Sequence, residues 1–149
     1  MKNILMPTDF SKTADNAFRY LQQFTEEIAG ELTVLNVYHP SVDTDAALDT
    51  LTLEVLADIR KKQLIKFVNG HAPGGMPEVM VEEPSTQLVL PGFAAEVIID
   101  QSSDGTYDLV AMGTSGRSGL LSKMFGSVSI EVAQKAACPV WLIPPKASY

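Results

Sequence analysis

The sequence lacks the features of a secreted or membrane protein. It contains one cysteine, Cys138, so no disulfide can form within the chain. No apolar run approaches the roughly 18 residues that a membrane-spanning helix needs. The apolar run near the N-terminus is also too short for a signal peptide. We therefore expect a cytoplasmic protein with no membrane partner.

Basic residues are also scarce. The chain has 11 Lys and Arg residues against 18 Asp and Glu residues, which gives a formal net charge of −7. A surface of that sign repels nucleic acid phosphates, so we expect no nucleic acid partner. Any anionic ligand would have to be bound locally, by backbone N–H groups. The two histidines, His39 and His71, are far apart and show no ligand spacing, so we expect no zinc site.

The composition is that of a globular protein. Hydrophobic residues make up 46% of the 149 residues and charged residues 19%, which argues against disorder. A chain of this length is close to the common size of a single folded unit. We expect one domain that spans residues 1–149.

Short apolar runs alternate with longer helical periodicities. Strands are expected at residues 4–7, 31–38, 79–81, 108–112 and 140–143, with helices at about 11–28, 45–69, 93–102 and 127–136. Segment 83–92 is apolar at its centre, but Pro84 and Pro91 bracket it, and we expect a loop there. The alternation predicts an α/β fold, a doubly wound parallel sheet with helices on both faces. Ligands bind such sheets beyond the carboxyl ends of the strands.

The connection after the fourth predicted strand, from Gly113 to Ser129, has the composition of a phosphate-binding loop. Gly113 allows the chain to leave the strand sharply, and Gly116 allows a ligand to approach the backbone closely. Gly126 and Ser127 open a helix whose first N–H groups are unpaired and carry partial positive charge. With hydroxyls at Ser127 and Ser129, this helix start is suited to an anion.

Two basic side chains in the same connection, Arg117 and Lys123, could reach the outer phosphates of a ligand bound there. The alternative is a surface loop that binds nothing, although typical connections in α/β units have only about 2–6 residues. Composition alone leaves both interpretations open. The segment is neither a P-loop nor a Gly-x-Gly-x-x-Gly motif.

The spacing Gly113-x2-Gly116-x9-Gly126-Ser127 resembles the ATP-binding signature of the universal stress protein family. Residues 4–11 (ILMPTDFS) are similar to the first strand and turn of that family, and residues 138–143 (CPVWLI) to its last strand. Segment 83–92 matches less well and is expected to be a loop near the pocket. The resemblance implies strand order 3-2-1-4-5 and a homodimer paired through the fifth strand, Val140–Ile143. Such pairing would protect an apolar edge strand from aggregation.

The resemblance also implies a binding site for ATP, accompanied by Mg²⁺. Pro7 and Thr8 would line one wall, Asp9 would accept hydrogen bonds from the ribose or adenine, Val37 would pack on the adenine, and the Met112 backbone would lie near the ribose. From the residues alone, Asp9 could instead cap the following helix, and Val37 and Met112 could be core residues. The predicted binding residues are Pro7, Thr8, Asp9, Val37, Met112, Gly113, Gly116, Arg117, Gly126, Ser127, Val128 and Ser129.

The function predicted from this resemblance is that of a nucleotide-dependent regulatory module in stress response, and we assign no catalytic residue. No histidine lies near the motif, and residues 8–11 (TDFS) lack the Ser-Gly-Gly-x-Asp-Ser loop of related nucleotide hydrolases. A receiver domain would need an acceptor aspartate after the third strand, where Glu82, Glu83 and Pro84 stand. Slow ATP hydrolysis, or a structural dimer that no longer binds nucleotide, are the remaining alternatives.

Overall fold

The computed structural model describes residues 2–40, 53–70, 85–115 and 125–149. Its strands form one parallel sheet in the order β3-β2-β1-β4-β5, which confirms the predicted fold. The strands are β1 (Asn3–Pro7), β2 (Glu31–Tyr38), β3 (Thr86–Pro91), β4 (Leu109–Gly113) and β5 (Val140–Ile143). The helices are α1 (Lys12–Ile28), α3 (Leu53–Asn69), α4 (Ala94–Ser103) and α5 (Ser127–Lys135).

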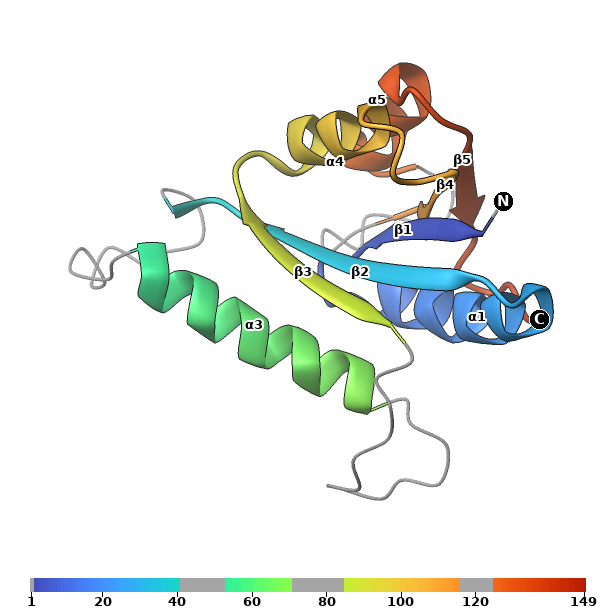
Figure 1. The fold of residues 1–149 in the computed structure, drawn as a ribbon, viewed down its shortest axis with the longest axis horizontal. Helices are drawn as coiled ribbons and strands as arrows, with labels where there is room; N and C mark the ends of the chain where they lie inside the picture. Colours follow the sequence, from blue (N-terminus) through green and yellow to red (C-terminus); the bar gives the residue numbers. More distant parts are fainter. Residues whose placement is uncertain (1, 41–52, 71–84, 116–124) are drawn as a thin grey trace.

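The helices cover both faces of the sheet. In Figure 1, α1 and α3 lie on one face, and α4 and α5 lie on the other. The central strand β1 shows why the sheet needs both layers, because Ile4, Leu5 and Met6 are all fully buried. Ile4 and Met6 belong to the hydrophobic core on the α1 and α3 side, and Leu5 to the core on the α4 and α5 side. A continuous apolar run is typical of a strand that is buried on both faces.

Helix α1 begins and ends with identifiable signals. The Ser11 hydroxyl accepts a hydrogen bond from the Ala14 N–H at 3.2 Å and caps the helix. The buried face carries an apolar stripe that includes Phe18. The helix ends at Ile28, before Ala29 in the left-handed conformation, and the Gly30 N–H closes its last turn on the Thr25 carbonyl.

The third strand of the sheet was predicted at the wrong place. The predicted strand 79–81 lies outside the described residues, and the strand that pairs with β2 is β3, within the segment expected to be a loop. Leu88 pairs with Leu35, and Pro91 with Tyr38. Because β3 is an edge strand, the missing N–H of Pro91 need not break the sheet.

The other predicted elements agree with the structure within one residue at each described end. The predicted start of the long second helix, residues 45–52, lies outside the described part of the chain, where α3 is seen from Leu53 onward. Within the described residues, no helix combines the length and hydropathy required to cross a membrane.

Candidate functional site

A cavity opens at the carboxyl ends of β1, β2 and β4, where the strand order reverses on either side of β1. This is the place at which doubly wound sheets bind their ligands. The volume is about 250 Å³, close to the lower limit of about 300 Å³ for small-molecule sites. The lining residues come from three strands, three helices and the turns that follow β1 and β4. They are Pro7, Thr8, Asp9, Ala14, Leu35, Val37, Ala94, Ile98, Met112, Gly113, Ser115, Gly126, Ser127, Val128 and Ser129.

Most of the predicted binding residues meet at this cavity. Pro7, Thr8, Asp9, Val37, Met112, Gly113, Gly126, Ser127, Val128 and Ser129 all line it. Gly116 and Arg117, together with Lys123, lie outside the described residues. The structure therefore brings together segments that are far apart in the sequence. That these residues bind a nucleotide stays a prediction.

Five lining residues were not predicted, and they differ in how visible they are in the sequence. Leu35 lies two residues before Val37 on β2 and thus on the same face of the strand, so alternation could have identified it. Ala94 and Ile98 lie one turn apart on α4 and reach the cavity only because α4 packs over this end of the sheet. Of the remaining two, Ala14 lies in the first turn of α1, and Ser115 lies two residues after the end of β4.

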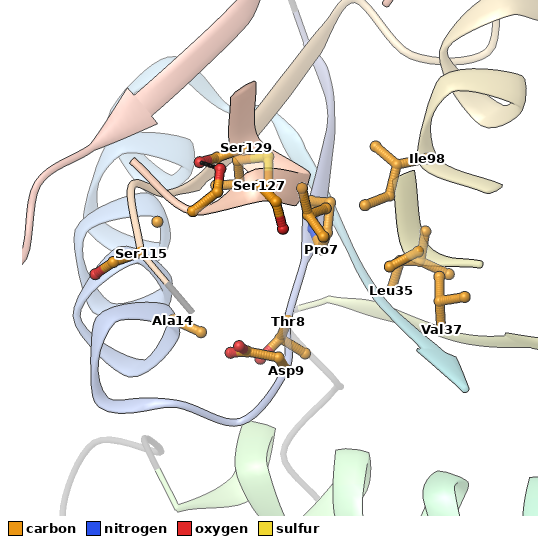
Figure 2. A pocket seen from close by; sticks show the side chains of 15 residues that line it. Pro7, Thr8, Asp9, Ala14, Leu35, Val37, Ile98, Ser115, Ser127 and Ser129 are labelled. Carbon is orange, nitrogen blue, oxygen red and sulfur yellow. Dashed lines mark hydrogen bonds between the residues drawn. The ribbon is translucent and has the colours of Figure 1, made fainter. Parts of the chain in front are cut away.

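The two ends of the cavity differ in chemistry. Figure 2 shows the apolar side chains of Leu35, Val37 and Ile98 close together on one side, with Asp9 and Ser115 away from them. A ligand that fits this arrangement has a flat apolar part and a strongly polar part.

The turn after β1 is fixed by a set of short hydrogen bonds. The Thr8 N–H donates to the Leu35 carbonyl, and the buried Asn36 amide donates to the Thr8 carbonyl, each at 2.8 Å. The Thr8 hydroxyl accepts from the Phe10 N–H at 3.1 Å. Asp9 Oδ1 accepts from the backbone N–H two residues later at 3.0 Å, which closes an Asx-turn. The side-chain cap of α1 is Ser11, so helix capping does not account for Asp9.

Gly113 has a structural role that differs from the predicted sharp exit. A Cβ atom at this position would lie 2.8 Å from Thr13 Cγ2 and 3.2 Å from the Thr13 carbonyl carbon and oxygen. The first turn of α1 therefore approaches the end of β4 so closely that a Cβ atom at position 113 would have to displace Thr13. The Thr13 and Ser115 hydroxyls form a hydrogen bond at 3.1 Å beside this contact.

The two ends of the connection between β4 and α5 are joined at what we call the neck, formed by Thr114, Gly126 and Ser129. The Gly126 N–H donates to the Thr114 carbonyl at 2.8 Å. The Ser129 hydroxyl is shared between the carbonyls of Gly126 at 2.8 Å and Thr114 at 3.1 Å. Ser129 is only 3% exposed, so its hydroxyl serves the neck. The exposed hydroxyl at the start of α5 is that of Ser127.

The cavity is lined both by the Asp9 carboxylate and by the start of α5. The helix begins after Gly126, which has no side chain to cap it, and the first N–H groups of α5 are at the cavity wall. These groups carry partial positive charge. Among the described residues, no group of three or more His, Cys, Asp and Glu side chains is placed to hold a metal ion. The site is therefore suited to an anion bound by backbone groups.

Comparisons with known proteins agree on one family. The model of the universal stress protein family matches residues 1–144. Universal stress protein MJ0577 of Methanocaldococcus jannaschii is 27% identical over 158 aligned positions, which cover 99% of this chain and 97% of the relative. A solved structure of MJ0577 superposes with a TM-score of 0.72 at 25% identity and covers 99% of this chain and 98% of that one.

Two more distant structures share the fold. A universal stress protein solved in complex with cAMP has a TM-score of 0.66 at 16% identity, covering 97% of this chain and 98% of that chain. The universal stress protein from Archaeoglobus fulgidus in complex with dAMP has a TM-score of 0.61 at 17% identity, covering 96% and 98%.

Proposed function

The chain belongs to the universal stress protein family, and from this premise we propose that residues 1–149 form one domain that binds ATP with Mg²⁺ in the cavity beside β1. The bound nucleotide would regulate the protein's contacts in a stress or energy response in the cytoplasm. The observation that carries the proposal is the pairing of an apolar slot with an uncapped helix start in one cavity.

Each part of the nucleotide has a partner in this arrangement. The adenine ring would lie between the apolar side chains of β2 and α4, including Val37 and Ile98. A ribose hydroxyl would donate to Asp9, and the phosphates would face the N–H groups of α5 beside Ser127. Asp9 is the one acidic side chain among the 15 described residues that line the cavity. A Mg²⁺ ion would therefore rest mainly on phosphate oxygens and water.

The relatives support an adenine nucleotide as the ligand class. Two proteins of the same fold have been solved with cAMP and with dAMP, and both ligands contain adenine and a phosphate. Within that class, ATP is favoured by the resemblance of the spacing of Gly113, Gly116, Gly126 and Ser127 to the ATP-binding signature of the family.

A binding module is favoured over an enzyme. Fast phosphoryl transfer needs a positioned base or water near the phosphates. The described cavity residues include no histidine or lysine, and they contribute the single carboxylate of Asp9. Slow hydrolysis of bound ATP and a structural dimer without nucleotide are the alternatives to be tested.

The first experiment identifies the small molecules carried by freshly purified protein. The protein is denatured and the released compounds are measured by mass spectrometry. Near-stoichiometric adenine nucleotide supports the proposal, and a falling ratio of ATP to ADP during incubation reports slow hydrolysis. If no nucleotide is released and added ATP causes no thermal shift, the nucleotide-free dimer replaces the proposed function.

A substitution at the helix start tests the location of the site. In Gly126→Val, the new side chain would occupy the space proposed for the phosphates. Its backbone (φ −65°, ψ 153°) is extended, a conformation that valine adopts readily. We expect ATP binding measured by calorimetry to be lost, with the apo Tm changed by no more than about 4 °C.

A matched control is available at the other end of the same helix. Ala136 has nearly the same backbone conformation (φ −60°, ψ 144°), so Ala136→Val introduces the same side chain at the far end of α5. It should leave ATP affinity unchanged. Equal ATP affinity in Gly126→Val and the wild type would show that the start of α5 is not part of the binding site.

A further inference from the structure

The chain changes direction after β1 at Phe10, whose backbone is in the left-handed region with φ of 63°. This conformation is disfavoured for residues that carry a Cβ atom, and a bulky residue adopts it only where surrounding contacts hold it. Phe10 is one of two non-glycine residues with positive φ in the described chain, and the other, Ala29, ends a helix.

The aromatic contact of Phe10 is with a residue of helix α3. The Phe10 ring packs edge-on against Phe67 of α3, with centroids 5.7 Å apart and an interplanar angle of 62°. Phe67 in turn packs against Phe18 of α1 at 5.3 Å, and Phe18 is fully buried. Phe10 is therefore anchored among α1 and α3, on the face of the sheet opposite to α4 and α5 (Figure 1).

The residues just before Phe10 face the cavity. Thr8 and Asp9 line it, whereas Phe10 does not. The bond from the Phe10 N–H to the Thr8 hydroxyl (3.1 Å) and the bond from the Ser11 N–H to Asp9 Oδ1 (3.0 Å) both span this reversal. The direction of Asp9 and the burial of the Phe10 ring are therefore two consequences of one backbone conformation.

We propose that Phe67 is a positioning residue for the cavity, although it belongs to α3, which contributes none of the described lining residues. Its ring holds Phe10 in the left-handed conformation, and this conformation places Thr8 and Asp9 at the cavity wall. The identity of the ligand in this inference rests on the function proposed above. The positioning itself concerns the turn and exists without ligand.

The experiment compares Phe67→Leu, Phe10→Gly and the double variant with the wild type. Glycine adopts the left-handed conformation without penalty, so it preserves the turn without needing the ring. Hydrogen exchange of the Phe10 and Ser11 amides, measured without ligand, reports the turn, and calorimetry with ATP reports binding. The matched control is Phe24→Leu, because Phe24 is half-buried like Phe67 but packs on Trp141 at 5.1 Å, away from the turn.

Phe67→Leu should speed exchange of both amides and weaken ATP binding by about five-fold each, the factor expected when a left-handed residue loses its support. In the Phe10→Gly background, the same substitution should change neither quantity. Phe24→Leu should lower the Tm but leave both quantities unchanged.

Two results would overturn the inference. One is amide exchange in Phe67→Leu no faster than in Phe24→Leu, and the other is an equal effect of Phe67→Leu in the Phe10→Gly background. If the wild type binds no ATP while Phe67→Leu still speeds exchange of the two amides, the proposed function fails and the positioning by Phe67 stands.

Discussion

Replacing Gly113 with alanine tests whether the first glycine of the loop motif is required by packing. The added Cβ would lie 2.8 Å from Thr13 Cγ2, closer than real Cβ contacts come, and 3.2 Å from the Thr13 carbonyl carbon and oxygen. Thr13 cannot easily rotate away, because its hydroxyl is bonded to the Ser115 hydroxyl at 3.1 Å. Overpacking of this kind costs about 1–3 kcal/mol, and alanine returns about 0.5–1 kcal/mol of backbone entropy relative to glycine.

The expected net loss in the free energy of unfolding is about 1–2 kcal/mol, equivalent to a fall in Tm of about 3–6 °C. Urea unfolding followed by the fluorescence of Trp141, the one tryptophan, measures it. Thr13→Ser removes the Cγ2 methyl and keeps the hydroxyl, so in that background Gly113→Ala should cost about half as much. An unchanged or higher stability of Gly113→Ala, or an equal cost in both backgrounds, would refute the role given to Thr13.

Three further predictions concern the ends of the chain and the oligomeric state. The N–H groups of Asn3 and Lys2 donate to the Asp108 carboxylate and lower its pKa below the ordinary 3.8, so Asp108→Asn should lower the Tm at neutral pH. That difference should shrink as pH falls below 3.8 through the folded pKa, because protonation then removes the wild-type advantage. A hydrogen bond to Glu27 raises the pKa of Tyr149 from 10.0 to about 12. The stabilisation of the folded chain by this hydrogen bond is therefore complete below pH 10 and disappears as pH rises towards 12. In Glu27→Gln, a tyrosinate absorbance titration should show this pKa returning towards 10. If edge strand β5 pairs two copies, light scattering should give twice the chain mass of 16.1 kDa, and a single chain mass would exclude the dimer.

The predictable part of the fold came from signals that are local in the sequence. The apolar run of β1 and the periodicity of α1 each report burial of one short segment, so the order of elements followed from them. Strand β3 was missed because a proline such as Pro91 generally argues against a strand, although an edge strand tolerates it. Whether a strand lies at an edge depends on the whole sheet, which no single segment reveals.

The candidate site divides in the same way. Asp9 follows strand β1 and Ser127 opens helix α5, and both kinds of position are visible in the sequence. Ile98 was missed because it reaches the cavity only through the packing of α4 over the sheet. Ser129 lines the cavity, and its hydroxyl donates to the two carbonyls of the neck, a pairing that the residue type does not reveal. Hydroxyl partners of this kind depend on tertiary geometry.

Because of the neck, the connection between β4 and α5 can be replaced without moving the two elements that it joins. Because the Gly126 N–H is bonded directly to the Thr114 carbonyl, the end of β4 and the start of α5 are held together whatever chain runs between them. Each doubling of the length of a flexible loop adds only about 0.6 kcal/mol of closure entropy. Segments of different length and composition can therefore be grafted between these two residues while the sheet and the helix keep their positions.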